Sequence, residues 1–526
     1  MTSDIGELPL GWASCSIEEL IGRDGLFVDG DWVESKDQDP NGEVRLIQLA
    51  DIGDGEFRNK SSRFLTKPTA IQLKCTFLKV GDLLVARMPD PLGRSCIFPL
   101  DGDERYVTVV DVCAIRLGCS EIDAKFLMYL VNSPSIRAEI NSLQSGSTRK
   151  RISRKNLATV KLPLPPLNEQ NRIVAKIETM FSELDKGIEA LKTARQQLEV
   201  YRQAVLKHAF EGKRTARWRQ ENRDKLESTE ILLARIQEER QARYQEQLRD
   251  WQIALKFWEA NGKAGKKPTK PSKPVYTKVS ELSELPTLPS GWIWLEYGGL
   301  CERIRNGISA KPEGEDGDKI FRISAVRPMD FALDDVRYID NSDHRFDDYR
   351  LKYGDLVFTR YNGSRAYVGV CAEYDGDGSH LFPDKLIQTR LGVASIHPSY
   401  LEKALNCGES RRFVEQRIRT TAGQSGVSGS DVKAIPVPIC SLDEQHQIVK
   451  FLAAELSRSD KMMEEIEFSL MKSEALRQSV LKKAFSGRLV SQDPNDEPAA
   501  VLLGRLRAEK ARQQKPGKAS RRVRRV

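Results

Sequence analysis

The sequence has few of the residues that metal-dependent or secreted proteins use. Among 526 residues there are only five histidines, and neither these nor the nine scattered cysteines fall at a metal-ligand spacing. No apolar run approaches membrane-spanning length, and the N-terminal MTSDIGELPLGW lacks the basic and apolar regions of a signal peptide. We therefore expect a cytoplasmic protein with reduced thiols, no metal site and no membrane contact.

Catalytic motifs are also missing from the sequence. It contains neither the Asn-Pro-Pro-aromatic tetrad of DNA methyltransferases nor a glycine-rich cofactor loop, and GKAGKK (262–267) does not have phosphate-loop spacing. FPDKLIQTR (382–390) has the Pro-Asp of some nucleases but lacks their separate acidic-x-Lys element, so Asp384 is better interpreted as a turn residue. We expect no catalytic residue and no cofactor bound by this chain.

Length and charge set wide limits on what the chain does. A chain of 526 residues is too long for one core and should form several domains. The formal net charge of +8, with 30% charged residues, permits a polyanionic partner without requiring one.

A tandem repeat organises the whole chain. PLNEQNRIVAKIETMFSELDK (166–186) is matched by SLDEQHQIVKFLAAELSRSDK (441–461), with Glu169 and Gln170 falling on Glu444 and Gln445. Other segments match in the same order, and the stretches between them diverge. The further matched pairs are LPLGW and LPSGW, GDLLVAR (81–87) and GDLVFTR (354–360), and RQAVLKHAFEG (202–212) and RQSVLKKAFSG (477–487).

Each repeat is predicted to end in a long helix. Prolines precede both segments, Asn168 or Asp443 can cap the first turn, and Gly212 or Gly487 can end the helix. About 43 residues between these signals make roughly 65 Å of helix, which needs a packing partner in water.

A heptad pattern predicts that the two helices pair as an antiparallel coiled coil, with polar residues such as Arg195 and Arg202 interrupting the apolar stripe. The alternative is that each helix lies on its own globular domain. The residues predicted to pair are Phe181, Leu184, Ile188, Leu191, Leu198, Leu456, Met463, Ile466, Leu470 and Val480.

On these repeated motifs the sequence resembles the specificity subunit of type I restriction-modification enzymes. The resemblance implies two target-recognition domains that each read one half of a bipartite, asymmetric site in double-stranded DNA, with the paired helices fixing the spacer. It also implies docking of two methyltransferase (modification) subunits and of motor-endonuclease (restriction) subunits. AdoMet, ATP and Mg²⁺ are then expected in those partner subunits.

The expected fold is α+β, with a pseudo-twofold arrangement of two globular target-recognition domains separated by the two helices. The predicted segments are recognition domain 1 (1–160), a first helical region (161–212), a helical insertion with a basic Pro/Lys linker (213–285), recognition domain 2 (286–434), a second helical region (435–487) and a basic C-terminal tail (488–526). The insertion is interpreted first as a spacer, and otherwise as an extra docking or DNA-contacting surface. The tail is either a solvated extension or a source of salt-sensitive DNA affinity.

Turn-rich loops at matching places in the two halves are the candidate DNA contacts. Cations suit phosphates, while Arg, Asn and Gln suit base edges. The candidate residues are Arg87, Arg94, Ser147, Thr148, Arg149, Lys150 and Arg151 in the first half, and Arg360, Tyr361, Asn362, Ser364, Arg365, Gln424 and Ser425 in the second. For any one of them an ordinary turn or surface role competes with a base contact.

Two other functions compete with DNA recognition. A self-contained nuclease or methyltransferase would need a cofactor motif, which the sequence lacks, and an assay of the purified chain alone for AdoMet-dependent methylation would decide. A coiled-coil structural protein would show no salt-dependent DNA binding.

Overall fold

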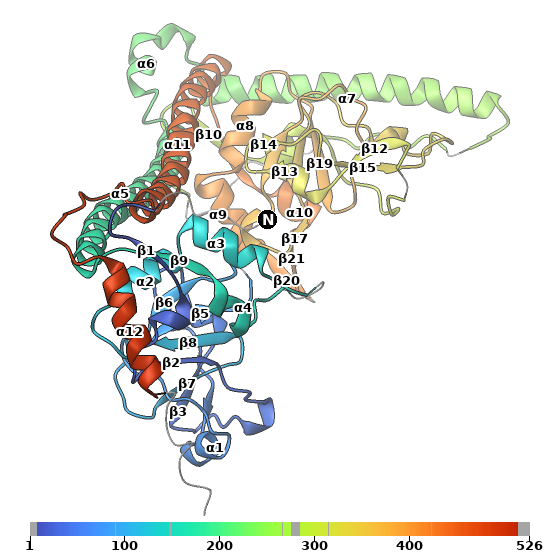
Figure 1. Cartoon of the computed structure of the whole chain (residues 1–526). Coiled ribbons are helices and arrows are strands. Elements are labelled where there is room, and N and C mark those ends of the chain that lie inside the picture. The colour runs from blue at the N-terminus through green and yellow to red at the C-terminus, as the bar shows by residue number, and fades with distance from the viewer. Residues whose placement is uncertain are drawn as a thin grey trace, which may run out of the picture. The chain divides into compact units, whose positions relative to one another are not determined.

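Two helices of 44 residues each, α5 (Leu167–Phe210) and α11 (Leu442–Phe485), dominate the computed structural model of the chain (Figure 1). The structure describes residues 8–89, 91–146, 150–265, 267–274, 285–313, 315–421 and 423–513. Its contacts divide the chain into unit 1, Met1–Thr193 with Ile466–Val526, and unit 2, Ala194–Glu465. Each long helix therefore contributes one part to each unit.

The helix ends follow the sequence signals with one correction. Gly212 and Gly487 adopt φ values of 68° and 69°, the left-handed conformation that ends a helix. The predicted caps are two positions late, because α5 begins at Leu167 and α11 at Leu442, so that Asn168 and Asp443 already lie inside the helices. In α11 the hydroxyl of Ser441 accepts the amide of Glu444 at 3.4 Å instead.

Unit 1 contains three small sheets, in the strand orders β2-β8-β5-β6, β4-β3-β7 and β1-β9. All pairs are antiparallel except β3 with β7. The strands are β1 (Ala13–Ser16), β2 (Leu26–Asp29), β3 (Val44–Ile47), β4 (Phe64–Leu65), β5 (Leu83–Ala86), β6 (Ser95–Ile97), β7 (Tyr106–Thr108), β8 (Val112–Arg116) and β9 (Lys161–Leu164). The helices besides α5 and α11 are α1 (Lys67–Gln72), α2 (Ala124–Val131), α3 (Pro134–Ser142), α4 (Arg154–Thr159) and α12 (Ala499–Gln513).

Unit 2 repeats two of these sheets, as β11-β19-β16-β18 and β10-β22, and adds β12-β15, β13-β14 and β17-β21-β20. The strands are β10 (Ile293–Glu296), β11 (Cys301–Asn306), β12 (Asp318–Phe321), β13 (Val326–Arg327), β14 (Asp330–Phe331), β15 (Val336–Ile339), β16 (Leu356–Thr359), β17 (Tyr361–Asn362), β18 (Cys371–Glu373), β19 (Leu386–Leu391), β20 (Arg419–Thr421), β21 (Gln424–Gly426) and β22 (Pro436–Ile439). The remaining helices are α6 (Ala216–Glu221), α7 (Thr229–Ala260), α8 (Pro398–Leu405), α9 (Gly408–Arg417) and α10 (Gly429–Lys433). The predicted α+β fold class is therefore confirmed.

The insertion does not behave as a bare spacer. Its predicted helix is present as α7, and Leu232 and Ile236 on α7 are buried in the core of unit 2. The linker that follows lies back on the same helix, since the indoles of Trp251 and Trp258 donate to the carbonyls of Pro268 and Gly265 at 3.1 and 3.2 Å. The first part of the insertion is thus built into unit 2.

The C-terminal segment likewise contains a docked helix where the sequence indicated a basic tail. Leu502, Leu503 and Leu506 of α12 are buried in the core of unit 1, and Arg507 pairs with Glu19 at 2.7 Å. Residues 514–526 of the predicted tail lie outside the described residues.

Helix α12 is the counterpart of the start of α7, which extends the repeat beyond the predicted segments. AAVLLGRL (499–506) aligns without a gap with TEILLARI (229–236) and is identical to it at Leu502, Leu503 and Arg505. Both helices also carry an ion pair at the same place, Glu497 with Arg505 at 2.7 Å and Glu227 with Arg235 at 2.5 Å. Each unit is therefore covered by a helix that follows a long helix in the chain.

Candidate nucleic-acid interface

The repeated GDL motif positions the central sheet of each unit. The carboxylate of Asp82 accepts two hydrogen bonds from Arg116 of β8, at 2.7 and 2.6 Å. Asp355 accepts the same two bonds from Arg390 of β19, at 2.7 and 2.6 Å. Such bidentate pairs fix the strands that lead into the candidate loops.

The repeated tryptophan and glutamate tie each unit to the start of a long helix. The indole of Trp12 donates to Glu169 at 3.1 Å, and that of Trp292 donates to Glu444 at 2.8 Å. Glu444 also accepts from Arg219 of α6 at 2.5 Å. Burial raises the pKa of Glu169. These glutamates anchor the helix to the unit, in addition to the favourable position at the helix N-terminus that the sequence predicts.

The repeated glutamine joins the same helix to a second one. Gln170 accepts the amide of Asp123, the residue that caps α2, at 3.2 Å, and Gln445 accepts that of His397, which caps α8, at 2.9 Å. Both side-chain amides donate to a carbonyl just before the long helix. The strongest sequence signal in the chain therefore marks structural joints.

In unit 1 the candidate loop begins and ends on a bridge between Ser145 and Arg151. Lys150 and Arg151 are exposed there, whereas Ser147, Thr148 and Arg149 lie outside the described residues. The amide of Ile152 donates to the carbonyl of Arg87 at 3.1 Å, so the loop sits beside the end of β5.

The prediction that Arg87 and Arg94 contact DNA is corrected by their surroundings. They are 7% and 6% exposed. The guanidinium of Arg87 donates to Asp29 and to the carbonyls of Val110 and Ile152. That of Arg94 donates to three other backbone carbonyls. Because buried main-chain carbonyls need donors, both arginines are structural.

In unit 2 the sheet β17-β21-β20 brings the two candidate loops together. Tyr361 pairs with Gly426, and Asn362 with Ser425. The amide of Val427 donates to the carbonyl of Arg360 at 3.0 Å, the same link that joins Ile152 to Arg87 in unit 1. The sequence predicted that the loop pairs occupy matching places in the two halves, and within unit 2 the structure puts the two loops side by side.

The candidate side chains of unit 2 differ in availability. Gln424, Ser364 and Arg365 are exposed, with Arg365 donating to the carbonyl of Glu415 at 3.0 Å. Arg360 lies over the ring of Tyr361 at 4.7 Å and donates to the carbonyl of Asp384. The candidates on the paired strands are partly occupied: Asn362 accepts the amide of Ser364, and Ser425, 7% exposed, bonds to Thr420.

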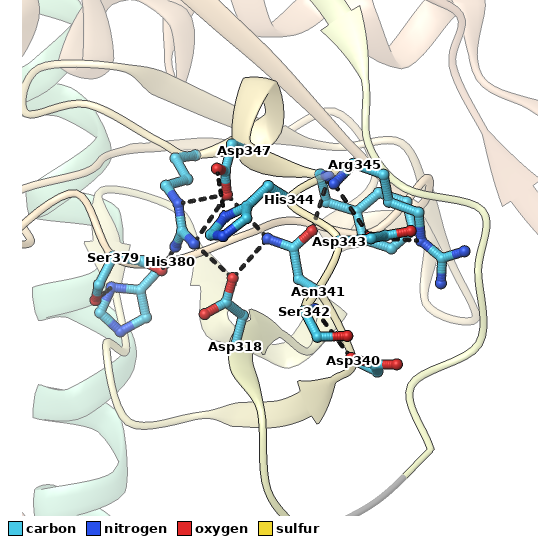
Figure 2. Close-up of polar contacts among 12 residues, drawn as sticks. Asp318, Asp340, Asn341, Ser342, Asp343, His344, Arg345, Asp347, Ser379 and His380 are labelled. Carbon is cyan, nitrogen blue, oxygen red and sulfur yellow. Dashed lines mark hydrogen bonds and ion pairs between the residues drawn. The ribbon is translucent and has the colours of Figure 1, made fainter. Parts of the chain in front are cut away.

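A second polar cluster in unit 2 satisfies itself internally. Figure 2 shows Asn341 reaching Asp318 of β12 and Asp347, at 2.7 and 2.9 Å. Arg350 donates to both carboxylates, and Asn341 is 6% exposed. Because these groups already have partners within the fold, the cluster shapes the loop rather than offering contacts.

Chemistry of other kinds has little support in the described part of the chain. No group of His, Cys, Asp and Glu there could hold a metal ion. Burial raises the pKa values of Cys15, Cys75 and Cys96 to about 12, so these thiols carry their protons at neutral pH. None of the helices in the described ranges is long and apolar enough to cross a lipid bilayer.

The long helices meet through ion pairs at equivalent positions of the repeat. In unit 1 Arg477 pairs with Asp185 and lies over Phe181 at 4.7 Å. In unit 2 Arg202 pairs with Asp460. The ten residues predicted to pair are all buried or half-buried, which agrees with the predicted face, and their pairing along the full helices stays a prediction.

Comparison with known proteins places the chain among proteins of one kind. Residues 30–199 match the family described as the type I restriction modification DNA specificity domain. The type I restriction enzyme EcoKI specificity subunit of Escherichia coli (strain K12) is 29% identical over 397 residues, covering 73% of this chain and 72% of that protein. The StySPI specificity subunit of Salmonella potsdam is 24% identical over 524 residues, covering 96% and 97%.

A solved structure shares the fold. A chain of a type I R-M system, solved to describe its complex assembly and conformational transition, aligns with a TM-score of 0.59 at 16% identity, covering 92% of this chain and all 100% of that chain.

Proposed function

The chain belongs to the type I restriction-modification specificity subunits and recognises DNA sequence, and from this premise we propose that its two units read the two halves of a bipartite, asymmetric target. Catalysis lies in other subunits of such enzymes. In this proposal unit 1 and unit 2 each supply one recognition domain, which corresponds to the predicted segments 1–160 and 286–434.

The proposal rests on one observation. The two units hold loops of different sequence on the same backbone framework. In both units the residue that follows the central strand, Arg87 or Arg360, accepts the same backbone hydrogen bond from the second loop. The loops themselves differ in composition: ARMPDPLGRS (86–95) stands where the second half has TRYNGSR (359–365), and SGSTRKRISRK (145–155) stands where it has TAGQSGVSGS (421–430). A shared frame with different loops suits two readers that approach DNA alike and recognise different bases.

The exposed loop residues, together with the half-buried Asn362, are the proposed contacts. Lys150, Arg151 and Arg365 suit phosphates, while Asn362 and Gln424 suit adenine edges. Tyr361, Ser364, Ser425 and Arg360 support the same surface. Ser147, Thr148 and Arg149 stay predictions from the sequence, and Arg87 and Arg94 are excluded for the reasons above.

The equivalent ion pairs support an antiparallel, pseudo-twofold pairing of α5 and α11. Asp185 and Asp460 hold the same position in the repeat, as do Arg202 and Arg477, and each aspartate pairs with the arginine of the other helix. Two helices related in this way would set a fixed spacing between the two readers, and so the length of the unspecified DNA spacer.

The same symmetry would give partner subunits two similar docking surfaces. We expect two methyltransferase subunits and, through them, motor-endonuclease subunits, all acting in the cytoplasm. AdoMet, ATP and Mg²⁺ would be bound by those partners.

A domain exchange tests the proposal. Replacing residues 286–434 by the matching segment of a relative with another specificity should change one half of the methylated sequence, mapped genome-wide, and leave the other half and the spacer unchanged. A second hybrid exchanges residues 213–434. It transfers Leu232 and Ile236 of α7 together with the core of unit 2 in which they are buried. A change in both halves of the methylated sequence would contradict the proposal that each unit reads one half-site.

A further inference from the structure

Unit 1 contains an open pocket of about 620 Å³ that the candidate loops do not include. Its lining comes from the segment after β2, from β3 and the residues behind it, and from the turn between β7 and β8. Trp32, Gln38, Gln48, Arg63 and Asp111 are the lining residues whose side chains bear on its chemistry.

Several polar groups of the pocket have no partner inside the fold. Within the described part of the chain, no hydrogen bond or ion pair uses the side chains of Gln38, Arg63 or Asp111. The polar cluster of Figure 2, in contrast, is closed on itself. Planar donors and acceptors left open beside a cavity are typical of a recognition surface rather than of a structural gap.

Trp32 adds a second unusual feature at the rim of the pocket. It is 69% exposed, while its indole nitrogen donates to Glu34 at 3.2 Å. Aromatic side chains that are held at one edge and open at the face are suited to contact with a nucleobase or sugar.

A buried arginine connects the pocket with the predicted DNA loop. Arg87 donates to the carbonyl of Val110 in the pocket wall and to that of Ile152, next to exposed Arg151, both at 3.0 Å. Arg151 and this wall of the pocket are therefore joined through one side chain, so a ligand bound at Arg151 would lie near the pocket.

The charges of the lining identify which part of DNA fits. The carboxylates of Asp31, Glu34 and Asp111 line the pocket, and Arg63 is the only lysine or arginine among its described lining residues. Carboxylates repel phosphates, but they accept hydrogen bonds from the exocyclic amino groups of cytosine and adenine. A glutamine amide matches the N6 and N7 edge of adenine.

We propose that this pocket reads base edges in the half-site assigned to unit 1, with Gln38 and Trp32 as specificity-determining residues and a preference for adenine. The inference rests on the proposed function and adds a place and a base class to it. Arg87 is a positioning residue, since it holds the pocket wall against the loop.

The test uses the complete complex with methyltransferase subunits on a library of duplexes with randomised half-sites, read by sequencing the methylated products. Trp32→Ala and Gln38→Ala should lower discrimination for adenine at one or more positions of one half-site by about 5- to 100-fold. Gln72→Ala is the matched control, because Gln72 is exposed on α1 of the same unit and does not line the pocket.

Gln38→Glu separates recognition from folding. A carboxylate accepts from cytosine and cannot donate to adenine N7, so the variant should shift the preference from adenine towards cytosine at the affected position, a change that a misfolded protein cannot produce. An unchanged preference in Gln38→Glu and Trp32→Ala, or a change confined to the half-site that the unit 2 exchange alters, would overturn the inference. A wild-type complex without sequence preference would instead overturn the proposed function.

Binding can be followed without methylation. The intrinsic fluorescence of Trp32, taken as the difference between wild type and Trp32→Phe, should change when the preferred duplex is added to the complex. If the difference signal stays constant on saturation with that duplex, the pocket does not face the DNA.

Discussion

Asp31 forms part of the pocket wall as a carboxylate whose charge the fold disfavours. Burial raises the pKa of Asp31 to about 6, although hydrogen bonds from Thr76 and Cys75 lower this pKa. A raised pKa means that the folded state binds the proton more tightly than the unfolded state. The stability that this carboxyl contributes is therefore complete below about pH 4 and is lost as pH rises through about 6.

The Asp31→Asn variant should show this dependence directly. Relative to the variant, the wild type should lose about 1 to 2 kcal/mol of stability between pH 4 and pH 7, a part of the full shift because the site is partly open to water. Thermal unfolding of both proteins across that range measures it. A difference in midpoint that stays constant with pH would show that Asp31 does not titrate in this way.

The residues whose role the sequence did not predict are those whose side chains bond to main-chain groups far away in the sequence. Arg87 and Arg94 stand in turn-rich segments as a DNA-contacting arginine would, but their partners include carbonyls 65 and 42 residues away. The pocket was missed for the same reason, since its walls come from segments that are adjacent only after folding. In contrast, the repeat aligns the loops of Arg360, Tyr361 and Gln424 with the candidate loops of the first half, and the role of these residues in DNA contact stays a prediction.

At the scale of elements, α12 should be essential to unit 1. Leu506 is 5% exposed in the unit 1 core, whereas Val501 on the same helix is 46% exposed. Leu506→Ala should lower the stability of unit 1 by about 2 to 4 kcal/mol through a cavity, and Val501→Ala by less than about 0.5 kcal/mol. Hydrogen exchange of β1 and the adjoining Ile17–Leu20 turn measures the difference. Equal exchange in the two variants would mean that α12 is not docked.

The two long helices could be predicted from local sequence signals, whereas the full extent of the repeat could not. Prolines, glycines and heptads located α5 and α11 to within a few residues, because those signals are local. The match of LLGRL to LLARI is hard to predict from the sequence, because the connectors after Gly212 and Gly487 differ in length. In addition, the basic residues that follow LLGRL resemble a solvated tail. Only the burial of Leu502 and Leu506 distinguishes a docked helix from that tail.

For the whole molecule, the proposed pairing of α5 and α11 predicts a ruler. Adding one turn of four residues to both helices at equivalent positions, after Gly187 and after Met462, lengthens each by about 6 Å. The unspecified spacer of the methylated sequence should then grow by about two base pairs, since base pairs are about 3.4 Å apart.

The control for the ruler lies outside the long helices. Adding the same number of residues to the linker at 267–274 should leave the spacer as it is. Mapping of methylated sites measures the spacer length for the helix variant and for the linker variant. An unchanged spacer in the helix variant would show that the long helices do not set the spacer length.

Unit 2 is one continuous stretch of chain, whereas unit 1 draws on both ends of it. Ala499 of α12 donates to the carbonyl of Gly11, and Ala484 and Phe485 complete the same core. A ribosome makes the part of unit 1 up to Thr193 before unit 2 but delivers α12 only after unit 2 has had time to fold. A message cut short before residue 499 would therefore release a protein whose earliest-made domain is the unfinished one, with its apolar face open to chaperones and proteases.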